Sequence, residues 1–205
     1  MTVAVLEVWA DVTCPFTHVG LHRIVDERDR RGRDDLHLRV RAWPLEQVNG
    51  VPMDAHAVAD KVAALRAQVA PDLFTGFDEA SFPVTTLPAL ALTEAAYRVG
   101  PAAGERAALI VRDLVFEEGR DVGDPAVLAA ASRAFGVEVT DADVAQVQND
   151  YDAGDARGVQ GSPTFFVGDE GFFCPTLNLT KVGDSLEIEF DHDAFDAFVE
   201  GVFSG

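Results

Sequence analysis

The spacing of hydrophobic residues at the start of the chain predicts a strand, a helix and a second strand. Residues 3–9 form an apolar run broken only by Glu7, which is typical of a buried central strand. From Pro15 to about residue 31 the apolar residues recur at helical spacing, and residues 36–43 alternate apolar with polar positions as a half-buried strand does. We therefore expect a βαβ unit with a right-handed crossover.

A long helical region follows this unit. From about residue 54 to residue 157 the pattern offers no strong strand candidate, and glycines and prolines fall between the apolar segments. Asp124 followed by Pro125 is a plain helix start, and Thr140 is a second N-cap candidate. The expected helices are residues 54–68, 86–99, 104–118 and 125–135, and one that begins near Asp141. The sequence thus predicts a helical block inserted into a βα framework.

The C-terminal part returns to a strand pattern. Residues 164–167 read as a short buried strand, residues 168–171 as a hairpin turn, and the return strand begins at residue 172. Residues 186–190 alternate cleanly and suggest an extra edge ribbon, and residues 194–203 form an amphipathic helix. The aromatic residues of the strands are expected in the core: Trp9, Trp43, Phe165, Phe166, Phe172 and Phe173.

Composition narrows the class of protein. With 205 residues, of which 48% are hydrophobic and 25% charged, the chain can bury a sizeable core. Its net charge of −19 argues against nucleic acid as a partner, and no apolar run reaches the length of a membrane span. Two cysteines cannot form a secreted disulfide framework, and the N-terminus lacks the pattern of a signal peptide. We expect a cytoplasmic protein without nucleic-acid or membrane partners.

One short stretch, residues 11–18, has the form of a thiol active site. Cys14 lies between the first strand and the first helix, where free N–H groups and the helix dipole stabilise a thiolate. Pro15 suits the first turn of that helix. Taken alone, the stretch is equally compatible with a small buried cysteine at a strand-to-helix turn.

Three motifs in this order resemble the DsbA-like oxidoreductases. They are Asp11-Val12-Thr13-Cys14-Pro15-Phe16, Phe82-Pro83-Val84-Thr85-Thr86, and Gly158-Val159-Gln160-Gly161-Ser162-Pro163-Thr164-Phe165. The resemblance is greatest to the branch of FrnE-type proteins, 2-hydroxychromene-2-carboxylate isomerases and kappa-class glutathione transferases. It implies an α/β thioredoxin fold with a helical insertion domain after the second strand: residues 1–50 and 158–205 form the thioredoxin-like domain, and residues 51–157 the insertion.

The resemblance also implies the parts of the site. Pro163 is expected to be cis and to face Cys14, while Ser162 offers its backbone to a bound thiol or peptide. Pro15 and Phe16 complete the expected substrate-binding residues. Members of the isomerase and kappa branch often pair, so a homodimer is a further expectation.

Thr17 departs from the oxidoreductase pattern, because it stands where a Cys-X-X-Cys motif has its second cysteine. Disulfide transfer by such a motif needs the second thiol to release a mixed disulfide, and Thr17 cannot supply it. The leading hypothesis is therefore a monothiol thiol-disulfide oxidoreductase, in which Cys14 attacks and an external thiol such as glutathione or mycothiol resolves the intermediate. No tightly bound cofactor is expected, and the partner is a small-molecule thiol or a disulfide-bearing protein.

Two other functions stay open. One is a glutathione- or mycothiol-dependent transferase or isomerase of the kappa or 2-hydroxychromene-2-carboxylate isomerase type. The other is a non-enzymatic thioredoxin-like scaffold in which Cys14 is a remnant.

Several neighbouring residues have open roles. His18 lies one helical turn after Cys14, where an imidazolium would favour the thiolate, or else it packs inside the fold. Thr17 either hydrogen-bonds the thiolate or pairs with local backbone. Cys174 is either a buried structural thiol or a resolving thiol that needs loop movement.

Other polar residues give no sign of a binding site. The remaining histidines show no metal-ligand spacing with the cysteines or with one another, so no metal is predicted. An acidic group is expected to form a solvated helix face: Asp141, Asp143, Asp150, Asp152 and Asp155.

Overall fold

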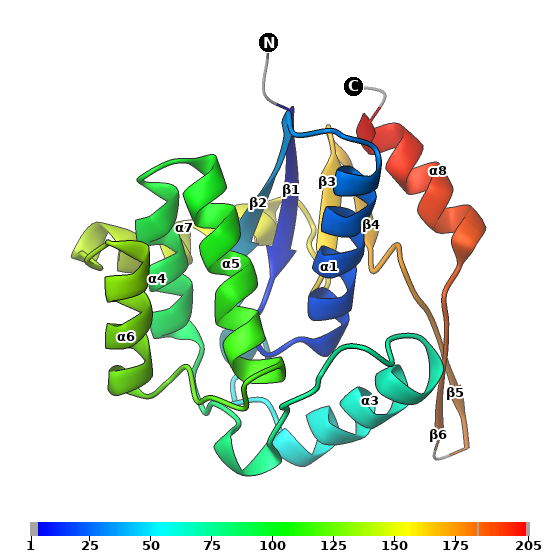
Figure 1. Ribbon diagram of the computed structural model, residues 1–205, viewed down its shortest axis with the longest axis horizontal. Helices are drawn as coiled ribbons and strands as arrows, with labels where there is room; N and C mark the ends of the chain where they lie inside the picture. The colour runs from blue at the N-terminus through cyan, green and yellow to red at the C-terminus, as the bar shows by residue number, and fades with distance from the viewer. Residues whose placement is uncertain (1–3, 184, 204–205) are drawn as a thin grey trace.

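Four strands form one mixed sheet in the order β2-β1-β3-β4. The computed structural model describes residues 4–183 and 185–203 (Figure 1). In it β1 (Ala4–Ala10) pairs in parallel with β2 (Leu36–Ala42), while β3 (Thr164–Val167) is antiparallel to both β1 and β4 (Glu170–Phe173). The helix α1 (Pro15–Arg30) connects β1 to β2, which confirms the predicted βαβ unit.

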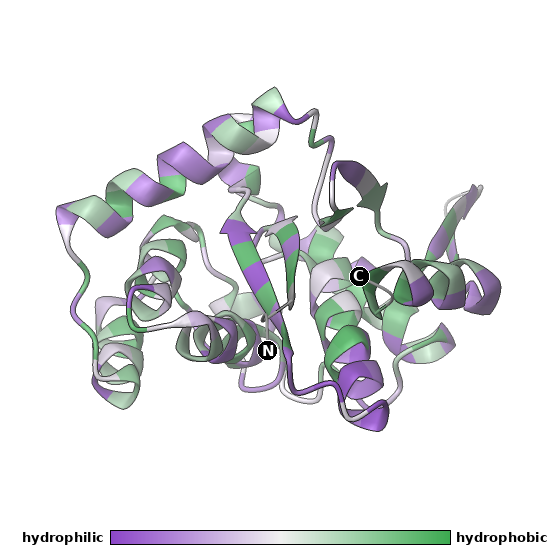
Figure 2. Cartoon of the chain, turned by 90° about the horizontal axis from the view of Figure 1, so that it is seen from above, coloured by the Kyte–Doolittle hydropathy of each residue, from purple (hydrophilic) through white to green (hydrophobic). Residues whose placement is uncertain are grey.

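Helices cover both faces of this sheet (Figure 2). On one face α1, α5 (Pro101–Phe116) and α8 (His192–Phe203) bury the even-numbered side chains of β1, such as Leu6 and Val8. On the other face α7 (Asp141–Ala156) places Tyr151 beside Trp9 and Trp43. Side chains of a strand alternate between its two faces, so β1 contributes to both cores.

The segment between β2 and β3 is helical, as predicted. It contains α2 (Leu45–Asn49), α3 (Ala55–Gln68), the 3₁₀ helix η1 (Glu79–Ser81), α4 (Leu87–Tyr97), α5, α6 (Pro125–Phe135) and α7. Ala108 of α5 is fully buried in the same core as the sheet residues. The helical insertion therefore shares a hydrophobic core with the thioredoxin-like part. The domain boundaries at residues 50 and 158 describe the order of the two parts along the chain and stay a prediction.

Two details of the C-terminal strands differ from the prediction. Val167 pairs with Glu170, so the hairpin turn is only Gly168 and Asp169, and Gly168 has the positive φ of 60° that such a tight turn needs. Phe173, expected in the core, is 58% exposed because β4 is the edge strand.

The predicted ribbon forms a separate sheet below the main one (Figure 1). Its strands are β5 (Asn178–Val182), which was not predicted, and β6 (Ser185–Glu189). The side chain of Gln68 accepts a hydrogen bond from the N–H of Ile188 at 2.9 Å and donates one to the carbonyl of Leu186 at 3.0 Å. These bonds fix the ribbon to the end of α3.

The prediction of a solvated acidic face on α7 was wrong for two of its members. Asp150 is 1% exposed; its carboxylate accepts a hydrogen bond from Arg41 at 2.9 Å, and its carbonyl accepts one from the Trp9 indole at 2.8 Å. Asp143 is 2% exposed and pairs with Arg98 at 2.7 Å. These carboxylates fasten α7 to the sheet and to α4. None of the helices within the described residues combines the length and apolarity needed to cross a bilayer.

Candidate thiol site

Cys14 is the N-cap residue of α1, at the end of the loop that leaves β1. Its backbone is extended (φ −83°, ψ 110°), and Pro15 begins the helix. The thiol donates a hydrogen bond to the carbonyl of Ser162, with Sγ 3.0 Å from the oxygen. Cys14 is only 4% exposed. The sulfur therefore lies at the positive end of the α1 dipole and is largely withdrawn from water.

Thr17 and Ser162 face each other beside this sulfur. Their hydroxyl oxygens lie 2.8 Å apart, and the Ser162 hydroxyl also accepts a hydrogen bond from the N–H of Asp11 at 2.9 Å. The Ser162–Pro163 peptide bond is cis. The structure thus brings Cys14, Thr17, Ser162 and Pro163 together. Thr17 was expected to hydrogen-bond the thiolate or the local backbone, and it bonds the Ser162 hydroxyl instead.

His18 has a different set of neighbours. Its Nε2 lies 2.8 Å from Oε1 of Glu117, just beyond the end of α5, and its ring packs against Phe74 and Phe116. Burial lowers the pKa of His18, outweighing the hydrogen bond to Glu117 that raises it. The imidazole is therefore neutral near pH 7, so the structure does not support its predicted role as a cation beside the thiolate.

Pro15 and Phe16 are less available than expected for substrate contact. Pro15 is buried in the first turn of α1. Phe16 is partly buried and packs against the apolar cluster that α1 shares with the helical block. The contacts of both residues position the first turn of α1 within the fold.

Asp11 is the residue that joins the three sequence motifs, and the sequence patterns did not single it out. It is 0% exposed, and its carboxylate accepts hydrogen bonds from Thr13, from the N–H of Leu45 at 2.9 Å and from the Thr86 hydroxyl at 3.0 Å. Its own N–H reaches Ser162. An acid two residues before a threonine at the end of a strand is an Asx-turn signal that the sequence does contain.

Arg112 of α5 is a second missed residue. It is 1% exposed and donates to the carbonyls of Ala108 at 2.6 Å and Asp11 at 3.3 Å. Burial lowers its pKa to about 10, against the charges of Asp11 and Cys14, which raise it. Arg112 therefore stays cationic at neutral pH and lies within electrostatic reach of Cys14. Nothing in the local pattern distinguishes it from a surface arginine.

Cys174 follows β4 directly and lies beside the cis-proline. Its N–H donates to the carbonyl of Pro163 at 3.0 Å, and both cysteines are free. Burial, reinforced by the negative charge of Cys14, raises the pKa of Cys174 to about 12. A thiol with that pKa is almost wholly protonated near neutral pH and is a weak nucleophile.

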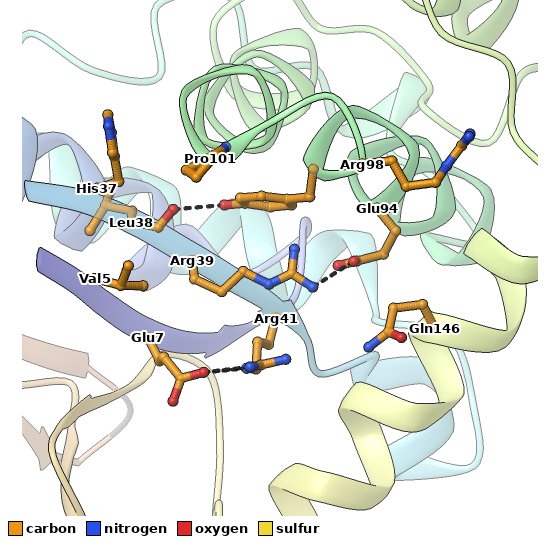
Figure 3. A pocket seen from close by; sticks show the side chains of 11 residues that line it. Val5, Glu7, His37, Leu38, Arg39, Arg41, Glu94, Arg98, Pro101 and Gln146 are labelled. Atoms are coloured by element: carbon orange, nitrogen blue, oxygen red, sulfur yellow. Dashed lines mark hydrogen bonds and ion pairs between the residues drawn. The ribbon is translucent and has the colours of Figure 1, made fainter. Parts of the chain in front are cut away.

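A separate cavity of about 520 Å³ lies on the face of the sheet away from α1 (Figure 3). Arginines from β2 enter it, but each is paired with a carboxylate: Arg39 with Glu94 at 2.6 Å, and Arg41 with Glu7 at 2.5 Å. The positive charge of this cavity is thus largely neutralised within it.

The sheet order, the helical insertion and the cysteine beside a cis-proline are those of a thioredoxin-fold protein. The chain belongs to the DsbA-like thioredoxin domain family, whose model matches residues 5–187. No curated protein matches the sequence.

Solved structures of low sequence identity share the fold. A 2-hydroxychromene-2-carboxylate isomerase is 18% identical with a TM-score of 0.62, and the match covers 82% of this chain and 88% of that one. The cytosolic disulfide reductase DsbM from Pseudomonas aeruginosa is 15% identical with a TM-score of 0.59 and 98% coverage of both chains. The catalytic domain of Proteus mirabilis ScsC is 13% identical, with a TM-score of 0.54, 98% coverage of this chain and 84% of that one.

Proposed function

We propose that this protein is a monothiol thiol-disulfide oxidoreductase that uses Cys14 as its nucleophile. The observation that carries the proposal is the position of the Cys14 sulfur at the N-terminus of α1, 3.0 Å from the backbone of Ser162 beside a cis-proline. The sulfur lies at a helix N-terminus and within electrostatic reach of the Arg112 cation, so both place positive charge near the proposed nucleophile.

The reaction takes place in two exchanges. The Cys14 thiolate attacks one sulfur of a disulfide R–S–S–R′, forms Cys14–S–S–R and releases R′–S⁻. A thiolate from a low-molecular-weight thiol then attacks the R sulfur, frees Cys14 as thiolate and leaves with R as a new disulfide. Each step exchanges one S–S bond for another, so the external thiol supplies the electrons that reduce the substrate.

The need for an external thiol follows from the two residues that could otherwise resolve the intermediate. Thr17 has a hydroxyl in the second position of the motif and is bonded to Ser162. Cys174 is buried, and its raised pKa of about 12 keeps it protonated. Glutathione or mycothiol fits the role, and a DsbM structure with GSH shares the fold at 16% identity. A reducing cytoplasm would supply either thiol and suits a protein with two free cysteines.

The substrate must open access to the Cys14 sulfur before it can react. Cys14 is 4% exposed and its thiol is bonded to Ser162. An incoming sulfur would take over the contact with the Ser162 backbone, which suits a small-molecule thiol adduct or an extended disulfide-bearing segment as the partner.

Intact-mass spectrometry after incubation with oxidised glutathione tests the proposal. We expect one glutathione adduct on the wild-type protein and on Cys174→Ala, and none on Cys14→Ser. Reduced glutathione should then remove the adduct. A wild-type protein that forms no adduct, or forms it on Cys174, would overturn the proposal.

Thr17→Cys is the matched gain-of-function variant. It restores the two-cysteine motif, so its mixed disulfide should collapse, without external thiol, to a disulfide between Cys14 and the introduced thiol. Turnover of an electrophile such as an aryl halide with glutathione, together with no disulfide exchange, would instead favour the transferase or isomerase function.

A further inference from the structure

A cluster of two histidines and an aspartate lies between α1 and α5, one turn beyond the thiol. His18 and His22 are four residues apart on α1, and Asp113 faces them from α5. Nε2 of His22 lies 3.1 Å from Oδ1 of Asp113, and Nδ1 of His18 lies 4.0 Å from the same oxygen. Among the residues described, these three form the one group whose nitrogen and oxygen ligand atoms all lie within 4.8 Å of one another.

Glu117 determines which ring nitrogen of His18 carries the proton and which carries the lone pair. Its carboxylate receives N–H groups from Phe74 at 2.6 Å and Thr75 at 2.9 Å and lies 2.8 Å from Nε2 of His18. A carboxylate with these donors is an acceptor, so Nε2 must carry the proton and Nδ1 must carry the lone pair. Carboxylate–imidazole pairs of this kind orient the histidines of metal sites.

The lone pair on Nδ1 has no hydrogen-bond partner among the described residues. His18 is 1% exposed, and among the described residues no donor reaches its Nδ1. A buried polar atom without a hydrogen bond is unusual and calls for a specific explanation, such as a bound ion. The atom lies beside His22 and Asp113, which are the two side chains that would complete a set of ligands.

The distances suit a small transition-metal ion. Ligand atoms about 2.1 Å from a tetrahedral zinc ion lie about 3.4 Å apart, which falls between the two measured distances to Asp113. The side chains of His22 and Asp113 are 30% and 32% exposed, so an ion can reach the cluster from solvent and keep an open coordination position. The net charge of −19 also attracts cations to the protein.

We propose that Nδ1 of His18, Nε2 of His22 and Oδ1 of Asp113 bind a divalent ion of the zinc class, with Glu117 orienting His18. Two imidazoles and one carboxylate are a zinc ligand set, whereas Mg²⁺ and Ca²⁺ prefer oxygen ligands. The ion replaces the proton that His22 shares with Asp113 and links α1, whose first turn holds Cys14, to α5. This revises the sequence expectation of no metal, which did not pair His18 with His22.

Titration of the metal-free protein with zinc tests this site by calorimetry. We expect one ion per chain for the wild-type protein and for Cys14→Ser, which shows that the active-site thiol is not the ligand. His22→Ala and Asp113→Asn should each weaken binding at least about 100-fold, and Glu117→Gln about 10- to 100-fold, the range for groups that orient a ligand. His56→Ala, at a side chain that is 77% exposed, is the matched control and should bind as the wild type does.

The visible absorption of bound cobalt tests for direct ligation. It would not depend on these side chains if their role were only structural. Co²⁺ bound by the wild type should give the visible absorption of a tetrahedral or five-coordinate site, and His22→Ala should lose it while keeping its circular dichroism spectrum. Mg²⁺ should not compete. No stoichiometric zinc binding, or zinc binding that His22→Ala and Asp113→Asn leave unchanged, would overturn the proposal.

Discussion

Replacing Asp11 by alanine would remove the carboxylate that joins the separate segments of the thiol site. Two of its hydrogen bonds reach distant parts of the chain: the N–H of Leu45 at 2.9 Å and the hydroxyl of Thr86 at 3.0 Å. Asp11 is 0% exposed, so water cannot take the place of the missing acceptor. The substitution would leave buried donors unpaired and would remove a negative charge that raises the pKa of Arg112.

The expected loss of stability in Asp11→Ala follows from these contacts. A hydrogen bond to a charged group contributes about 1.5–3 kcal/mol, so the two distant bonds together account for about 3–6 kcal/mol. We expect Asp11→Ala to lower the free energy of unfolding by about 3–6 kcal/mol. Asp11→Asn keeps the shape and one acceptor oxygen, and should cost about half as much.

Urea unfolding followed by circular dichroism measures this loss as a lower midpoint at an unchanged slope. In a chain of this length the melting temperature should fall by about 6–24 °C. Asp72→Ala, at an exposed carboxylate, is the control and should change stability by less than about 0.5 kcal/mol. A loss below about 1 kcal/mol for Asp11→Ala would refute the reasoning that this carboxylate holds the segments together.

Three further predictions concern other parts of the molecule. Gly154→Ala would place a Cβ 2.6 Å from the Trp9 ring and should destabilise the protein by about 1–3 kcal/mol in urea unfolding, whereas Gly201→Ala, which meets nothing within 4 Å, should not. Burial raises the pKa of Glu94 to about 7 despite the pairing with Arg39. The native state then keeps a proton that the unfolded chain has lost, so stability falls as pH rises from about 4.5 to 7, and Glu94→Gln should flatten that slope in unfolding measured across pH. Iodoacetamide at pH 8 should alkylate Cys174 only in denaturant, because its pKa of about 12 keeps the folded thiol protonated, and peptide mapping reports the modified site.

Each of these has an outcome that contradicts it. Equal stability of the two glycine variants would mean that α7 moves away from the sheet at little cost. An unchanged pH slope in Glu94→Gln would assign the slope to another group. Alkylation of native Cys174 would show that the thiol is accessible, and would reopen its role as a resolving group.

The local patterns of the sequence determined most of the secondary structure. Apolar spacing placed the βαβ unit, the longer helices between β2 and β3 and the C-terminal helix. Each of these elements buries one face, and this burial produces a periodic pattern of apolar residues in the sequence. The strand β5 and the short helix α2 were missed. Both are short segments whose partners lie outside their own stretch of chain, in β6 and in the carboxylate of Asp11.

The sequence also determined that Cys14 begins a helix and that Thr17 occupies the place of a second cysteine. Only the tertiary structure decided which groups surround that sulfur. Arg112 comes from α5, about a hundred residues away, and His18 turns toward Glu117 at the end of that helix. Side-chain direction and burial depend on contacts between distant segments, and such contacts leave no period along the chain. The sequence therefore specified the nucleophile, whereas packing of α5 against α1 specified its electrostatic surroundings.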